Sequence, residues 1–119
     1  MKIALAQVNP IIANFSHNNE RIRQCVDQAI AQSCDLVIFS ELVISGYPPQ
    51  DLVEKKDFVD ANVASLNRML DTIRGIGVIC GFVDHNPADE GKRVCNSAVL
   101  FEDGQIRHQV QKRLLPTYD

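Results

Sequence analysis

Two segments with helical periodicity alternate with short apolar runs, and this alternation constrains the fold more than any other feature of the chain. In residues 16–32 apolar side chains recur at three- and four-residue spacing, which predicts an amphipathic helix with Asn14 or Ser16 as its N-cap. Residues 58–74 repeat the pattern, and Gly75 follows as a stop signal. With 119 residues, the chain is long enough to bury a core without disulfides or a metal.

Strand-like runs lie before, between and after these helices. Residues 2–8 alternate in polarity, and residues 36–39 and 77–83 are apolar runs of the kind found in strands buried on both faces. Residues 97–110 contain two further runs around an Asp-Gly pair, which is a hairpin signal. The order strand, helix, strand, helix, strand, strand, strand predicts an α/β fold with early parallel strands and a later antiparallel hairpin.

The last segment, residues 111–119, contains a proline and carries no helix or strand signal. The predicted sheet would therefore keep an open edge, and its helix layer would be incomplete. We expect residues 1–119 to be the N-terminal part of a larger domain.

The composition argues against several classes of function. The net charge is −3 and the basic residues are scattered, so we expect no nucleic-acid partner. No segment approaches the roughly 18 apolar residues of a membrane span, and no export signal is present, so we expect a cytoplasmic protein. In a reducing compartment the four cysteines are expected to be free thiols. Neither their spacing nor that of the histidines indicates a metal site.

One carboxylate, Glu41, stands in an otherwise apolar run directly after the strand predicted at residues 36–39. In open α/β sheets the functional crevice lies beyond the carboxyl ends of such strands. A carboxylate among apolar residues at that place would be desolvated, which suits a general base. The alternative is a Glu41 that turns outward into solvent, and the local sequence supports both interpretations equally.

Lys112 is the cation that could pair with Glu41. It follows a predicted strand, residues 105–110, and from there could offer a positive charge to a developing oxyanion. The alternative is a solvated loop lysine beside Arg113, which the local sequence by itself favours.

None of the cysteines stands out as a reactive thiol. Cys80 lies in the middle of a predicted strand, between Glu41 and Lys112 in sequence, and we expect it to be a buried structural thiol. The others belong to a helix stripe or border strands, without a basic neighbour that would activate them: Cys25, Cys34 and Cys95.

Two segments together resemble the motifs of a known family. Residues 40–52 read Ser-Glu-Leu-Val-Ile-Ser-Gly-Tyr-Pro-Pro-Gln-Asp-Leu, and residues 111–119 read Gln-Lys-Arg-Leu-Leu-Pro-Thr-Tyr-Asp. They are similar to the Glu and Lys motifs of the carbon–nitrogen hydrolase (nitrilase) superfamily, and the opening Ile-Ala-Leu-Ala-Gln-Val-Asn-Pro is similar to its first strand. Within the superfamily, the Ser-Gly-Tyr-Pro-Pro-Gln-Asp-Leu sequence resembles the N-terminal glutaminase domain of bacterial glutamine-dependent NAD synthetases.

The resemblance implies a nitrilase-like α-β-β-α sandwich, of which this chain would be the N-terminal portion, and a Glu-Lys-Cys triad. Glu41 matches the general base, and Lys112 matches the residue that stabilises the tetrahedral oxyanion. Tyr47 and Tyr118 match positions that line the glutamine pocket. In the family the nucleophilic Cys follows the Lys, so this chain would lack it and be inactive by itself.

The resemblance also implies a function for the parent protein. Glutamine would be hydrolysed, and its ammonia would pass to a separate synthetase domain that uses ATP and Mg to amidate deamido-NAD to NAD. This segment would need no cofactor, and the parent is expected to be a homo-oligomer. A free-standing amidase or nitrilase is one alternative. A non-catalytic α/β module is another, although a carboxylate at a strand end argues against it.

Overall fold

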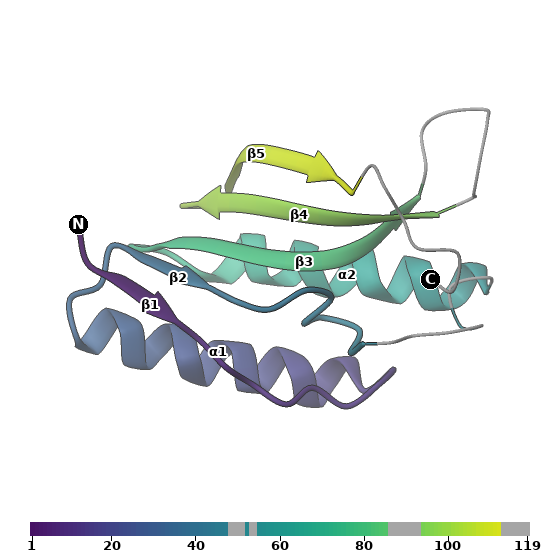
Figure 1. The fold of residues 1–119 in the computed structure, drawn as a ribbon, viewed down its shortest axis with the longest axis horizontal. Helices are drawn as coiled ribbons and strands as arrows, with labels where there is room; N and C mark the ends of the chain where they lie inside the picture. The colour runs from purple at the N-terminus through teal and green to yellow at the C-terminus, as the bar shows by residue number, and fades with distance from the viewer. Residues whose placement is uncertain (48–51, 53–54, 86–93, 113–119) are drawn as a thin grey trace.

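The computed structural model describes residues 1–47, 52, 55–85 and 94–112 (Figure 1). The elements in chain order are β1 (Ile3–Leu5), α1 (Phe15–Ala31), β2 (Leu36–Ile38), α2 (Lys56–Thr72), β3 (Gly77–His85), β4 (Val94–Glu102) and β5 (Gln105–Gln111). The predicted order of elements and the α/β class are confirmed.

Local signals explain where several elements begin and end. Helix α1 begins after Asn14, whose side chain accepts a hydrogen bond from the His17 N–H at 3.1 Å, so the first of the two expected N-caps is the one used. Strands β4 and β5 meet at Asp103-Gly104, whose φ angles of 50° and 81° are those of a type I′ hairpin turn. Strand β1 is shorter than predicted, because its partner β2 is itself only three residues long.

The strands form one sheet in the order β1-β2-β3-β4-β5. Strands β1, β2 and β3 are parallel, and β4 is antiparallel to both β3 and β5. The expected parallel start and antiparallel hairpin are therefore confirmed. Because β5 is antiparallel to β4, its carboxyl end lies at the same edge of the sheet as those of β2 and β3, and this edge carries the candidate site.

Both helices pack on one face of the sheet (Figure 1). The core that they form with the sheet is one cluster of buried apolar side chains, among them Ile22 and Val26 of α1, Leu66 and Met69 of α2, and Val37, Val78, Val99 and Phe101 of the strands. Burial of such side chains is the main source of stability in a domain of this size.

The other face of the sheet is only partly covered by the residues that the structure describes. Leu5, Ile38, Ile79 and Leu100 form one row across this face through the register of the paired strands. Leu5 is 76% exposed, and β5 is exposed along its whole length. The described residues therefore form one helix layer and one sheet, as the first two layers of an α-β-β-α sandwich would.

A buried asparagine ties α1 to the turn at residues 41–45, which follows β2. The Asn18 side chain, 1% exposed, donates from Nδ2 to the backbone oxygens of Ile11 at 2.8 Å and Ile44 at 3.0 Å. Its Oδ1 accepts from the Ile11 N–H at 2.7 Å. Since Ile44 belongs to the turn that begins with Glu41, Asn18 helps to hold that turn against the helix layer.

We expect Asn18→Leu to lower the free energy of unfolding by about 2–4 kcal/mol, because it leaves three backbone groups without their partner. Urea unfolding followed by circular dichroism measures the change. The matched control is Asn19→Leu, which removes only the partly buried contacts of Nδ2 with Ser65, to Oγ at 3.0 Å and to the backbone oxygen at 3.4 Å. It should cost about 1 kcal/mol. Equal losses in the two variants would contradict the special role of Asn18.

Candidate active site

Glu41 and Lys112 meet at the edge of the sheet where β2, β3 and β5 end. Glu41 follows β2 and begins the turn at residues 41–45, and Lys112 follows β5 directly. Lys112 Nζ lies 3.2 Å from Glu41 Oε1, although the two residues are 71 positions apart in the chain. The structure thus confirms that these two predicted site residues come together.

A third polar residue, Asn96, contacts the same carboxylate and was not singled out from the sequence. Asn96 Nδ2 donates a hydrogen bond to Glu41 Oε1. Its backbone oxygen accepts from the Lys112 N–H at 2.8 Å. The available signal was a polar pair, Asn96-Ser97, in a strand that is otherwise apolar as far as Phe101. Such a pair is also compatible with an ordinary hydrogen-bonded strand, so the sequence could not assign it to the site.

These three residues line a hollow of about 230 Å³. The rest of its lining comes from the end of β2 and from β3, β4 and β5: Phe39, Ser40, Ile79, Cys80, Gly81, Ser97, Ala98, Val110 and Gln111. Most of these side chains are apolar or small. The hollow therefore combines an apolar wall with one ion pair, which is a common composition for a small-molecule site.

The side chain of Glu41 is more exposed than that of a desolvated carboxylate, which was one of the two interpretations of the sequence. Its side chain is 45% exposed and that of Lys112 is 38% exposed. The desolvated carboxylate is therefore a wrong expectation for the described residues. The physical reason is the turn itself, in which Leu42, Val43 and Ile44 enter the core while Glu41 faces the hollow. An ion pair this exposed contributes little to stability, so the fold alone does not explain it.

The backbone that carries Glu41 lies directly against Gly81 of β3. A Cβ atom built on Gly81 would be 2.5 Å from the Leu42 nitrogen and 3.2 Å from the Glu41 Cα. Leu42 also has a φ of 51°, in the left-handed region that non-glycine residues rarely occupy. The close approach and this strained residue together set the position of Glu41.

All four cysteines lie within the described residues, and all are free thiols as predicted. Cys80 borders the hollow but is fully buried, and this burial raises the pKa of its thiol to about 12. Burial also raises the pKa of Cys95. A thiol with so high a pKa carries almost no thiolate near neutral pH. Cys80 is therefore buried as expected, and its role as a structural thiol stays a prediction.

Neither of the two tyrosines expected to bind glutamine is found in the described lining of the hollow. Tyr47 is 44% exposed and is not among the residues that line the hollow. Tyr118 lies outside the described residues. Their role in binding glutamine stays a prediction.

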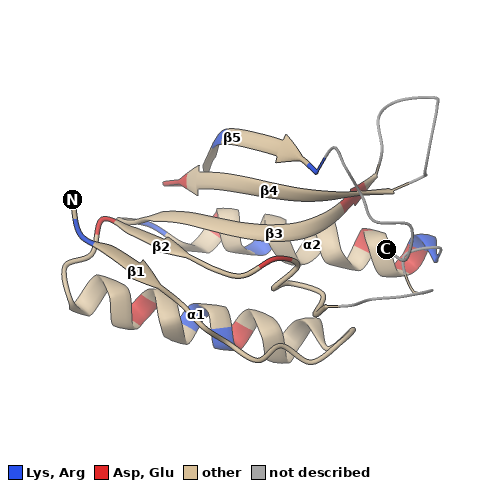
Figure 2. Cartoon of the chain, in the orientation of Figure 1, with Lys and Arg blue, Asp and Glu red and all other residues tan. Residues whose placement is uncertain are grey.

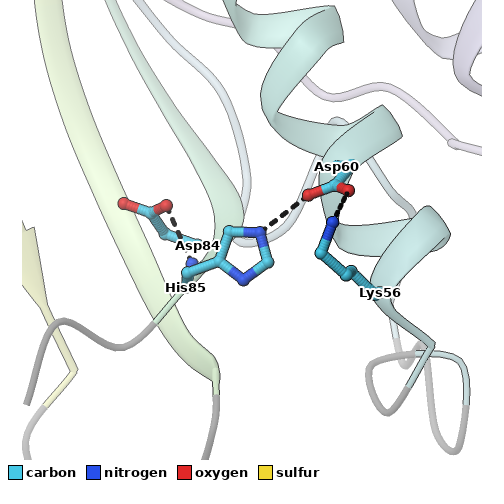
Figure 3. Close-up of polar contacts among 4 residues, drawn as sticks. All are labelled: Lys56, Asp60, Asp84 and His85. Carbon is cyan, nitrogen blue, oxygen red and sulfur yellow. Dashed lines mark hydrogen bonds and ion pairs between the residues drawn. The ribbon is translucent and has the colours of Figure 1, made fainter.

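A separate polar cluster joins the start of α2 to the end of β3 (Figure 3). Asp60 Oδ1 lies 2.9 Å from His85 Nε2, and Asp60 Oδ2 lies 3.0 Å from Lys56 Nζ. Hydrogen bonds from His85 and Lys56 lower the pKa of Asp60. Any stability from these contacts is thus present above the unfolded-state pKa of Asp60 and is lost as the pH falls through its folded-state pKa. The cluster is exposed and lies outside the lining of the hollow.

Charged residues of both signs are interspersed along α1 and α2 (Figure 2). Among the described residues no group of three or more His, Cys, Asp or Glu side chains could hold a metal ion. Neither of the two described helices has the length and apolar character needed to cross a membrane.

The family model described as "Carbon-nitrogen hydrolase" matches residues 2–118. The chain belongs to the carbon–nitrogen hydrolase family. The resemblance expected from the Glu and Lys motifs is thereby confirmed, and both Glu41 and Lys112 lie within the matched region.

This carbon–nitrogen hydrolase chain is similar to proteins called glutamine-dependent NAD(+) synthetase. It is 40% identical to that of Synechocystis, over 98% of this chain and 22% of the relative. It is 32% identical to that of Thermotoga maritima, over 99% of this chain and 20% of the relative. The chain thus spans about a fifth of the length of the curated relatives that it matches.

Solved structures of an NAD+ synthetase and of an amidase share its fold. The glutamine-dependent NAD+ synthetase of Acinetobacter baumannii superposes with a TM-score of 0.85 at 32% identity, over 98% of this chain and 22% of that one. An amidase of the nitrilase superfamily from Nesterenkonia superposes with a TM-score of 0.79 at 26% identity, over 98% of this chain and 44% of that one. In a variant of that amidase, the acetamide moiety of fluoroacetamide is covalently added at the active-site cysteine. The predicted nitrilase-like fold class is confirmed.

Proposed function

We propose that this chain is the N-terminal part of the glutaminase domain of a glutamine-dependent NAD synthetase. The observation that carries the proposal is the Glu41–Lys112 ion pair, 3.2 Å long, at the border of an apolar hollow in a carbon–nitrogen hydrolase fold. Identity of 40% to an NAD(+) synthetase along almost the whole chain supports glutamine as the substrate. A separate synthetase domain of the parent would bind ATP, Mg and deamido-NAD and use the ammonia.

Each residue of the ion pair has a distinct role in this proposal. Glu41 is the general base for the nucleophilic thiol. The ammonium group of Lys112 stabilises the oxyanion that develops on the amide carbonyl. Because Cys80 is fully buried, we assign the nucleophile to a cysteine of the parent protein outside residues 1–119.

In the proposed reaction the thiol proton passes to Glu41 while the sulfur forms a bond to the side-chain amide carbon of glutamine. The carbon–nitrogen bond then breaks as Glu41 returns the proton to the departing nitrogen, so that ammonia leaves and a thioester remains. Water next gives a proton to Glu41 and attacks the thioester. Glutamate is released, and the proton returns to the cysteine sulfur.

The partly exposed face of the sheet supports placing the chain in a larger domain. Some apolar side chains on this face are about half exposed, including Ile3 at 47% and Val110 at 50%. A second sheet packed on this face would bury them and complete the expected α-β-β-α sandwich. We further propose that the parent is a cytoplasmic homo-oligomer.

The test compares nitrogen sources in the full-length protein. We expect NAD to form from deamido-NAD with either glutamine or ammonia, and glutamate to be released only from glutamine. Cys80→Ala should retain both activities, and the 119-residue chain alone should release no ammonia from glutamine. Loss of glutamate release in Cys80→Ala, with the ammonia-dependent reaction intact, would contradict the assignment of that thiol.

The same assays separate the alternative functions. Hydrolysis of simple amides without amidation of deamido-NAD would favour a free-standing amidase, such as the one from Nesterenkonia. No hydrolysis of any amide or nitrile by the full-length protein would favour a non-catalytic module.

A further inference from the structure

We propose that Asn96 is a positioning residue, which fixes the orientation of the Glu41 carboxylate and leaves its second oxygen to act as the base. This inference rests on the proposed function of Glu41. It adds a residue that belongs neither to the ion pair nor to the pair of tyrosines expected to bind glutamine.

Two donors converge on one oxygen of Glu41. Asn96 Nδ2 and Lys112 Nζ both donate to Oε1, and no residue that the structure describes donates to Oε2. A carboxylate held through a single oxygen presents the other one in a defined direction. In the proposed reaction Oε2 is therefore the oxygen to which the thiol proton is transferred.

Asn96 is better placed than Lys112 to fix this geometry. It lies within β4, paired with Val83 of β3 on one side, and its backbone oxygen accepts from the Lys112 N–H on the other. Its side chain is short and has few rotatable bonds, whereas the lysine ammonium ends a flexible four-carbon stem. The asparagine thus connects three segments of the site: the turn of Glu41, strand β4 and the end of β5.

Removing the Asn96 amide should therefore cost the Glu41 carboxylate its fixed orientation. Oε2 would then face the thiol proton less often, so the loss should appear mainly in kcat rather than in KM for glutamine.

The test uses Asn96→Ala and Asn96→Asp in the full-length protein. We expect the kcat/KM for glutamine to fall about 10- to 100-fold in Asn96→Ala, the effect of losing one hydrogen bond to a charged group. The loss should lie in kcat rather than in KM for glutamine, while ammonia-dependent NAD formation stays unchanged. Gln109→Ala is the matched control, since this β5 amide donates to Asp84 Oδ2 at 3.0 Å and should leave both activities intact.

The relative activities of the two variants distinguish a positioning role of Asn96 from a packing role. Aspartate keeps the volume of asparagine but places a second negative charge beside Glu41, so we expect Asn96→Asp to be at least as inactive as Asn96→Ala. A packing role predicts the reverse order. If either variant loses the ammonia-dependent reaction through misfolding, Asn96→Ser, too short to reach Glu41, replaces it in the comparison.

Wild-type kinetics in the Asn96 variants, or a loss confined to KM for glutamine, would overturn the inference. Full glutamine-dependent activity in a Glu41→Gln variant would instead overturn the proposed function itself. The two failures are therefore distinguishable in one set of assays.

Discussion

Glu41→Gln is expected to lower the glutamine-dependent kcat/KM by about 10²- to 10⁴-fold, the usual contribution of a general base. Glutamine has nearly the same shape as glutamate but cannot accept the thiol proton. Ammonia-dependent NAD formation should stay unchanged, because free ammonia bypasses the amide hydrolysis. The measurement is NAD formation by the full-length protein with each nitrogen source, together with glutamate release.

Two further variants complete this experiment. Lys112→Ala should show the same separation of the two activities, because it removes the charge that stabilises the oxyanion. Glu102→Gln is the matched control, since it removes an exposed carboxylate at the far end of β4 and should change neither activity. Loss of both activities in Glu41→Gln would mean that this residue supports folding rather than amide chemistry.

Gly81→Ala is expected to reduce the glutamine-dependent kcat/KM by about 100-fold or more, since misplacement of a catalytic group by about 1 Å is enough for such a loss. The added Cβ would lie 2.5 Å from the Leu42 nitrogen, so the turn that carries Glu41 must move away from β3. The obstructing atoms belong to the backbone and cannot rotate aside. We also expect the free energy of unfolding to fall by about 1–3 kcal/mol.

The matched control is Gly75→Ala, in the connection between α2 and β3. A Cβ there would meet no atom within 4 Å, but the residue has a φ of 83°. The control variant should therefore lose about 1–2 kcal/mol of stability through backbone strain and retain its glutamine chemistry. Equal glutamine-dependent activity in the two variants would show that the contact between Gly81 and the turn does not position Glu41.

The elements of this fold were largely predictable because their signals are local. Helical spacing of apolar residues predicted both helices, and the Asp103-Gly104 pair predicted the hairpin between β4 and β5. The ends of some elements, such as that of β1, were predicted less accurately. They depend on how many residues of a neighbouring strand are available for pairing. That number is a property of the sheet and not of the segment.

The candidate site was predictable only in part. Glu41 and Lys112 each follow a predicted strand, and the family resemblance assigned both residues to one catalytic site. The exposure of Glu41 could not be predicted, because it depends on the direction in which its turn enters the core. The third polar contact depends on the register of β4 with β5, which places Asn96 beside the residue that follows β5.

The sequence by itself determined the class of fold, its order of elements, the family and the two charged residues of the candidate site. Periodicity, turn residues and motifs determine these features, and all of them can be recognised along a single segment. Only the tertiary structure decided that Asn96 and Lys112 share one oxygen of Glu41 and that Gly81 must be glycine. Those contacts join residues far apart in the chain, so they exist only after the strands have paired and the turn at residues 41–45 has packed against β3.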